Sequence, residues 1–431
     1  MNPNKNKFKI VLTSVFGFFI LLGMVVFATY KSSNTANTNV EVSVWGTMDS
    51  STFSNFIEKY KQDKNIELKL KYTQKDPSTI DSDILEAIAS GHAPDSILIP
   101  QQLMKRYLDK VYLITNIPTR TFSDTFVQES DIYVTQNGIF ALPFFIDPLV
   151  MYYNRDILSG AGIANPPKSW AEIPLLAGKI SKSDNNANIT KSAVSFGEYS
   201  NVNNAKALLS ALIMQAGSPI VGTSDGVRFQ SYLYTRSPTD ITIPTVSALS
   251  FFTDYSNPKK SVYSWNRSLP SSKQSFLSGD LALYFGFASE AQDLKDKNPN
   301  LNFDVALLPQ IVDAKSKLTY GDIYGFAFLK SSPNIAAAYN MISTLISTDA
   351  VSTLLQFMDV APARRDLIMA GSSDPAKTIF YNSALISRAW IDPDTNKTDQ
   401  IFQKMVEDIS SGRMNVDGSV QRASLELDNL F

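Results

Sequence analysis

Alternating hydrophobic and polar positions predict strands along this chain, and apolar positions three or four residues apart predict helices. Val40, Val42 and Val44 alternate with polar residues, which predicts a first strand. An apolar helical stripe follows, made of Phe53, Phe56, Ile57 and Tyr60. A second alternating segment then contains Ile66, Leu68, Leu70 and Tyr72. A further helical stripe around Ile84 ends at Gly91, and the run SILI then predicts a short buried strand. This order of strands and helices predicts an α/β protein.

The segment from 138 to 173 is rich in aromatic residues and proline. Pro143 predicts a loop or an edge strand, because proline has no N–H to donate to a sheet. The apolar run from Leu149 to Tyr153 predicts a buried strand. Ser169, followed three residues later by Glu172, has the spacing of a capping box at a helix start. We expect this segment to lie at a change of domain.

The N-terminal region has the pattern of a membrane anchor. From Ile10 to Tyr30 no residue is charged, and a helix of this length spans about 30 Å, the thickness of a bilayer core. Lysines at positions 5, 7 and 9 precede it, so the positive-inside rule predicts a cytoplasmic segment 1–9 and an extracytoplasmic remainder. Residues 31–39 form a polar linker. The bulky Tyr30 does not suit a small-x-small cleavage site, which predicts an uncleaved anchor.

Length and composition limit the classes of function. A chain of 431 residues suggests two domains, and its net charge of −2, without a long basic run, argues against nucleic-acid binding. There is no cysteine, so disulfides and a lipid attached through cysteine are excluded. One histidine, His92, cannot build a zinc site, and the segment Asp392 to Gln403 lacks the glycine and glutamate of a calcium loop. We expect no metal and no cofactor.

Several short motifs occur in a specific order between Val40 and about Arg365. They read VEVSVWGTMD, ILEAIASGHAPDSILIP, ALPFFIDPLVMYYNRDILSGAGI, PPKSWAEI, FLSGDLALYFGFASE, FDVALLPQ, YGDIYGFAFLKSS and VAPARR. In this order and spacing the chain resembles the extracellular solute-binding proteins of ABC importers, family 1. This group includes maltose-binding and other oligosaccharide-binding proteins.

The resemblance implies a periplasmic-binding-protein-like fold of type II, with two discontinuous α/β lobes, a hinge and a cleft between the lobes. Residues 40–147 and 305–348 are expected to form lobe 1. Residues 148–304 and 349–431 are expected to form lobe 2. The ligand is expected to bind in the cleft and to be buried when the hinge closes.

The resemblance also implies a set of ligand-binding residues in the cleft. Their aromatic, carboxylate and amide groups suit the C–H faces and hydroxyls of a sugar. They are Trp45, Thr47, Met48, Asp49, Gln101, Gln102, Phe144, Asp147, Phe287, Asp322, Tyr324 and Arg364. Asp147 is the strongest candidate, whereas Trp45 also suits a core position and Arg364 also suits pairing with a surface acid.

The implied function is capture of a small solute, with a sugar or oligosaccharide as the expected ligand, and its delivery to an ABC transporter permease. The expected partners are therefore the solute, the permease and the membrane. A membrane-anchored sensor or a surface glycan-binding module remains an alternative. A glycoside hydrolase is a third, because two carboxylates from Asp147, Asp322, Glu198 and Glu290 would suffice if suitably spaced.

Overall fold

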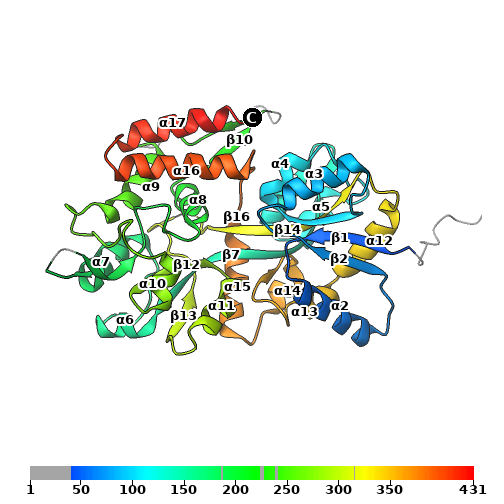
Figure 1. The fold of residues 1–431 in the computed structure, drawn as a ribbon, viewed down its shortest axis with the longest axis horizontal. Helices are drawn as coiled ribbons and strands as arrows, with labels where there is room; N and C mark the ends of the chain where they lie inside the picture. Colours follow the sequence, from blue (N-terminus) through cyan, green and yellow to red (C-terminus); the bar gives the residue numbers. More distant parts are fainter. Residues whose placement is uncertain (1–39, 186–187, 224–227, 238–240, 315) are drawn as a thin grey trace, which may run out of the picture. The chain divides into compact units, whose positions relative to one another are not determined.

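The computed structural model describes residues 40–431 apart from 186–187, 224–227, 238–240 and 315 (Figure 1). The predicted anchor at 10–30 and the segments beside it lie outside the described residues. Within the described part of the chain, no helix is both long enough and apolar enough to cross a membrane. The fold is α/β, as the pattern of apolar residues predicts.

A mixed sheet has the strand order β2-β1-β3-β14-β7-β12-β9-β8. The bounds of these strands are β1 Val42–Gly46, β2 Leu70–Gln74, β3 Ser96–Pro100, β7 Leu142–Asn154, β8 Lys182–Ser183, β9 Ile189–Val194, β12 Leu281–Phe287 and β14 Thr319–Leu329. Short strands pair beside this path: β4 Val111–Tyr112, β13 Phe303–Ala306, β15 Ala361–Pro362 and β16 Ser387–Arg388. Two separate pairs are β5 Val134–Thr135 with β6 Gly138–Ile139, and β10 Val221–Thr223 with β11 Phe229–Ser231.

Strand β7 joins two groups of strands. Its residues 142–148 pair with β14, which continues to β3, β1 and β2; we call these the β1 group. Its residues 149–154 pair with β12 and β13, and β12 continues to β9 and β8; we call these the β12 group. Pro143 is the second residue of β7 and not a loop residue, and among the described strands only β14 pairs with it, which is the edge position that the sequence also allowed. A register shift opposite Tyr324 and Gly325 forms a bulge there, where a missing N–H is tolerated.

Helices of the β1 group follow the predicted pattern. Their bounds are α2 Ser50–Lys64, α3 Ile80–Ser90, α4 Met104–Tyr107, α5 Thr119–Thr125, α12 Ile335–Leu345, α13 Thr348–Leu354 and α14 Arg365–Ala370, and Figure 1 shows them around β1, β2 and β14. Phe53, Phe56 and Tyr60 of α2 are buried, as their spacing predicts. Gly91 ends α3 with φ 74°, a left-handed conformation that glycine adopts without strain.

Helices of the β12 group surround the other end of β7 in Figure 1. Their bounds are α6 Arg155–Gly160, α7 Ile173–Ile180, α8 Ala205–Gln215, α9 Pro244–Thr253, α10 Ser272–Leu277, α11 Glu290–Lys297, α16 Thr395–Ser410 and α17 Val416–Asp428, while α15 Pro375–Ile386 packs on β7. Short 3₁₀ turns are η1 Gln101–Leu103, η2 Gln128–Tyr133, η3 Trp170–Glu172 and η4 Asp254–Ser256. The capping box of Ser169 and Glu172 is confirmed at the start of η3, which leads into α7.

Candidate functional site

Two neighbouring cavities lie beside the carboxyl ends of β1 and β3, where ligands commonly bind in α/β proteins. Their volumes are about 240 and about 660 Å³. Thr47 and Tyr324 line both, so we treat the two as one site and call it the paired cavity. The smaller part is lined by Thr47, Met48, Asp49, Thr52, Leu98, Phe145, Asp147, Ser289, Tyr324, Met358 and Val360. The larger part adds Pro77, Ser78, Ile80, Asp81, Pro100, Gln102, Leu103, Arg106 and residues 393–397.

The turn after β1 forms one wall of the paired cavity. Gly46 ends β1 in a tight space, since a Cβ there would lie 2.9 Å from the Tyr72 hydroxyl oxygen and 3.1 Å from Leu98 Cβ. The Tyr72 hydroxyl donates to the Met48 carbonyl oxygen at 2.9 Å and so holds the turn. Asp49 then caps α2 by accepting from the backbone N–H of Thr52 at 2.8 Å. These contacts fix the turn that brings Thr47, Met48 and Asp49 to the cavity wall.

Asp147 lies in the middle of β7 and lines the smaller part. It is 9% exposed, and its two oxygens accept from Ser289, from the backbone N–H at 2.9 Å and from the hydroxyl at 2.5 Å. Desolvation raises the pKa of the Asp147 carboxyl to about 7, and the acids Asp322 and Glu290 also raise it, whereas the Ser289 hydrogen bonds lower it. The carboxyl is therefore able to donate or accept a hydrogen bond near neutral pH.

Asp322 is the cross-strand neighbour of Asp147 on β14. Its Oδ1 accepts from Gln101 Nε2 at 3.1 Å and from Gln102 Nε2, and both amides also donate to the Tyr320 hydroxyl. Desolvation raises the pKa of Asp322 above its ordinary value, against the lowering effect of these hydrogen bonds. The result is a polar cluster that joins the end of β3 to β14.

The carboxylates weighed for a hydrolase are occupied by donors. Glu290 accepts from the Tyr284 hydroxyl at 2.7 Å and the Phe287 backbone N–H at 2.9 Å. Glu198 pairs with Arg267 at 3.2 Å and lines neither part of the paired cavity. Among the described residues, no group of three or more acids or histidines is placed to hold a metal ion.

Two aromatic residues line the smaller part of the paired cavity. The rings of Tyr324 and Phe145 stack with centroids 4.7 Å apart and planes 17° apart, and both residues line the smaller part. Trp45 lies outside both parts, where Lys75 Nζ is 3.9 Å from the centroid of its ring. The Phe287 ring packs edge-on against Tyr320, also outside the lining.

The structure brings only some of the candidate residues to the cavity wall. Thr47, Met48, Asp49, Gln102, Asp147 and Tyr324 line it, and Gln101 and Asp322 lie directly behind Gln102. Phe144 is fully buried, and Phe145 takes the place at the wall instead, because neighbouring strand residues point to opposite faces. Arg364 pairs with Asp366 at 2.8 Å, which is the surface pairing weighed from the sequence.

Sequence reasoning missed several wall residues. Phe145 and Ser289 carry usable signals, since Phe145 is next to the chosen Phe144 and Ser289 follows the strand of Phe287. Arg106, Met358 and the segment 393–397 have no local signal, because long-range packing alone brings them to the cavity.

We predict that Gln101→Ala lowers the free energy of unfolding by about 2 kcal/mol, because it leaves buried polar groups unpaired. Gln101 is 1% exposed, and its Oε1 accepts from the backbone N–H of Ile323 at 2.7 Å. Gln102→Ala is the matched control, because the Gln102 side chain bonds the same Asp322 and Tyr320 but is only partly buried. Urea denaturation should give a clearly smaller loss for Gln102→Ala, and equal losses would contradict the assigned role of Gln101.

Known proteins resemble this chain in sequence and in fold. The family model described as bacterial extracellular solute-binding protein matches residues 45–352. The crystal structure of a cyclo/maltodextrin-binding protein complexed with maltotetraose matches with a TM-score of 0.71 and 14% identity, over 90% of this chain and 96% of that one. Putative binding proteins from Brucella abortus (strain 2308) and Brucella suis biovar 1 (strain 1330) are each 39% identical over 59 residues. That match covers 14% of this chain and 14% of each relative.

Proposed function

Because this chain belongs to the bacterial extracellular solute-binding protein family, whose members bind solutes and are not enzymes, we propose that it captures an oligosaccharide in the paired cavity. In this proposal the protein delivers the sugar to the permease of an ABC importer. We also keep as a proposal that the segment 10–30 anchors the protein in the membrane.

The chemistry of the cavity wall carries the choice of a sugar. The ring of Tyr324, which stacks on the nearly buried Phe145 and is itself only partly buried, offers an aromatic face for the C–H face of a pyranose ring. The carboxyl of Asp147, the Thr47 hydroxyl and the Gln102 amide belong to the same lining. Such groups bond sugar hydroxyls, and ligand pockets of a few hundred Å³ are common for molecules of this size.

We propose that the two groups of strands correspond to two lobes that close on the ligand. The partners of β7 change between residues 148 and 149, which supports a hinge there. The other predicted boundaries need adjustment in this proposal. β13 pairs with the β12-group part of β7, so the chain fits better passing between the lobes near 319–322 than at 305. α13 packs on α2, so the last passage between the lobes fits better after 354 than at 349.

The first test is thermal denaturation of the purified full chain with monosaccharides, malto-oligosaccharides, amino acids and polyols. A ligand that binds only the folded protein stabilises it by about 2.7 kcal/mol at a hundred times its dissociation constant. We predict such stabilisation with an oligosaccharide, and its loss in Tyr324→Ala, because that substitution removes the aromatic surface. Tyr112→Ala is the matched control, since Tyr112 is a strand residue that is 46% exposed and does not line the paired cavity.

The outcomes separate the alternatives. Stabilisation by an amino acid or polyol and by no sugar would overturn the sugar and leave a solute-binding protein. Consumption of an oligosaccharide during the assay would contradict the binding role and favour a glycoside hydrolase.

A further inference from the structure

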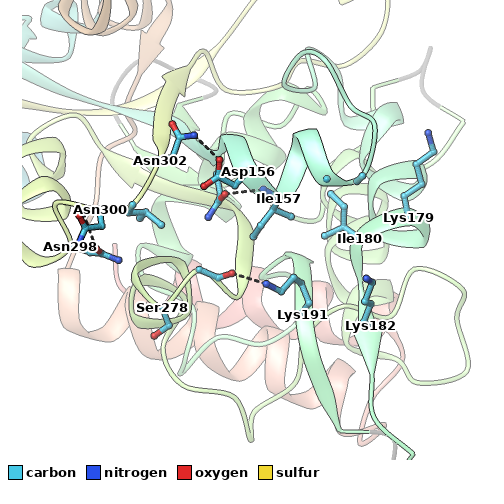
Figure 2. Close-up of a pocket in the computed structure, with 15 residues that line it drawn as sticks. Asp156, Ile157, Lys179, Ile180, Lys182, Lys191, Ser278, Asn298, Asn300 and Asn302 are labelled. Carbon is cyan, nitrogen blue, oxygen red and sulfur yellow. Dashed lines mark hydrogen bonds between the residues drawn. The ribbon is translucent and has the colours of Figure 1, made fainter.

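A second polar cavity, of about 490 Å³, lies in the β12 group and shares no lining residue with the paired cavity. Its walls come from α6, the end of α7, β8 and β9, the turn after α10 and the loop before β13 (Figure 2). Its volume is in the range that binds small organic ligands. We call it the lysine–asparagine cavity after the two kinds of side chain that dominate its lining.

Lys179, Lys182 and Lys191 line one side of this cavity. Lys191 Nζ donates to the Gly279 carbonyl oxygen at 2.9 Å and lies 3.8 Å from Asp280. Among the described residues, no carboxylate oxygen lies within 4.0 Å of the ammonium group of Lys179 or Lys182. This side of the cavity therefore carries positive charge that the protein itself neutralises only in part.

The placement of two of these lysines is unfavourable for the fold alone. Lys182 of β8 and Lys191 of β9 are direct partners in an antiparallel pair. Side chains at such positions lie on the same face a few ångströms apart, and like charges there destabilise the pair. A local conflict of this kind is typical of a functional site, because a bound anion would remove it.

Asparagines form the opposite side of the cavity. Figure 2 shows Asn298, Asn300 and Asn302 across the cavity from the three lysines. Asn298 Nδ2 donates to the Leu277 carbonyl oxygen at 2.8 Å, and its Oδ1 accepts from the backbone N–H of Asn300 at 3.1 Å, so this amide is held in place. Asn302 Nδ2 donates to Asp156 at 2.6 Å, which engages the acidic side chain in the lining.

Asn154 adds a buried polar group between the two sides. It is 4% exposed, and its Oδ1 accepts from the backbone N–H of Ile157 at 3.0 Å. Within the described part of the chain, Asn154 Nδ2 makes no hydrogen bond, and the atom is accessible from the cavity. A fixed amide donor is thus available to a ligand.

We propose that the lysine–asparagine cavity binds an anionic saccharide, meaning a sugar that carries a phosphate or carboxylate group. The ammonium groups of Lys179, Lys182 and Lys191 bind the anionic group through charge-assisted hydrogen bonds. The amides of Asn154, Asn298 and Asn300 bind the hydroxyls of the ring. This proposal does not depend on the ligand of the paired cavity.

Isothermal titration of the full chain tests this proposal with four probes: glucose 6-phosphate, glucuronate, glucose and inorganic phosphate. We expect glucose 6-phosphate and glucuronate to bind, more weakly at high salt, and glucose not to bind here. The double variant Lys182→Gln/Lys191→Gln should bind them at least about tenfold more weakly, because two charged donors are lost. Lys182→Arg/Lys191→Arg should restore binding.

Two controls distinguish this site from the paired cavity. Lys295→Gln removes an exposed lysine on α11 outside both sites and should bind the anionic sugars normally. Tyr324→Ala should also retain their binding, while the lysine double variant retains the ligand of the paired cavity. Equal affinity for inorganic phosphate and glucose 6-phosphate would overturn the saccharide, and absence of binding by both anionic sugars at millimolar concentration would overturn the site.

Discussion

Phe144→Ala is expected to lower the free energy of unfolding by about 3–5 kcal/mol, the usual cost of removing a buried phenylalanine ring. The side chain is 0% exposed, and its ring centroid lies 4.9 Å from that of Phe326 and 6.0 Å from that of Phe56. These contacts join α2 to β7 and β14, so the cavity left behind would lie in the core of the β1 group. Urea denaturation monitored by circular dichroism measures the loss.

Two further variants make the test of Phe144 decisive. Phe144→Leu fills most of the volume and should cost less than about 1.5 kcal/mol, which keeps the protein folded for ligand titration. Phe357→Ala, at a ring that is 37% exposed, should cost clearly less than Phe144→Ala. If Phe144→Leu instead preserved stability and abolished ligand binding, the ring would have the ligand-facing role expected from the sequence.

The pH dependence of stability should change in Asp147→Asn. Burial raises the pKa of this carboxyl from its ordinary value of 3.8 to about 7 in the folded protein. The folded state therefore holds a proton between these values that the unfolded state has released, so stability falls as the pH rises from about 4 to about 7. The contribution is at most about 4 kcal/mol, at 1.36 kcal/mol for each pKa unit.

Asp147→Asn keeps the shape of the neutral acid and removes its titration. Denaturant midpoints between pH 5 and pH 8 should therefore vary less in this variant than in the wild type. Asp322 should also make stability fall as the pH rises, because burial raises its pKa too. Some dependence of stability on pH should therefore remain in Asp147→Asn. Asp124→Asn, at a side chain 73% exposed, should leave the slope unchanged. An unaltered slope in Asp147→Asn would contradict a buried neutral carboxyl.

Much of the fold could be predicted from the sequence, because local periodicity and burial agree in its first third. Val42 and Val44, and then Phe53 and Phe56, have the spacing of the strand and helix in which the structure places them. The sequence left a loop and an edge strand open for Pro143, because only the pairing with β14 shows that the residue belongs to a strand and has one partner strand there.

The candidate site was predictable where short motifs define the ends of strands. Thr47, Asp49 and Gln102 follow β1 and β3 directly and do line the paired cavity. The choice between Phe144 and Phe145 required knowledge of which face of β7 is covered, and that is set by packing against α2. The segment 393–397 lies close to 300 residues from β3 in the chain, so no local pattern could bring it to the same wall.

The long strand β7 has a consequence for how the chain folds during synthesis. The half of β7 that pairs with β14 has its partner about 175 residues later in the chain, as the pairing of Asp147 with Asp322 shows. Until that segment leaves the ribosome, β3 and β7 both present unpaired edges, which are prone to intermolecular pairing. Closing so long a loop also slows folding. The nascent chain is therefore expected to depend on chaperones until β14 has been made.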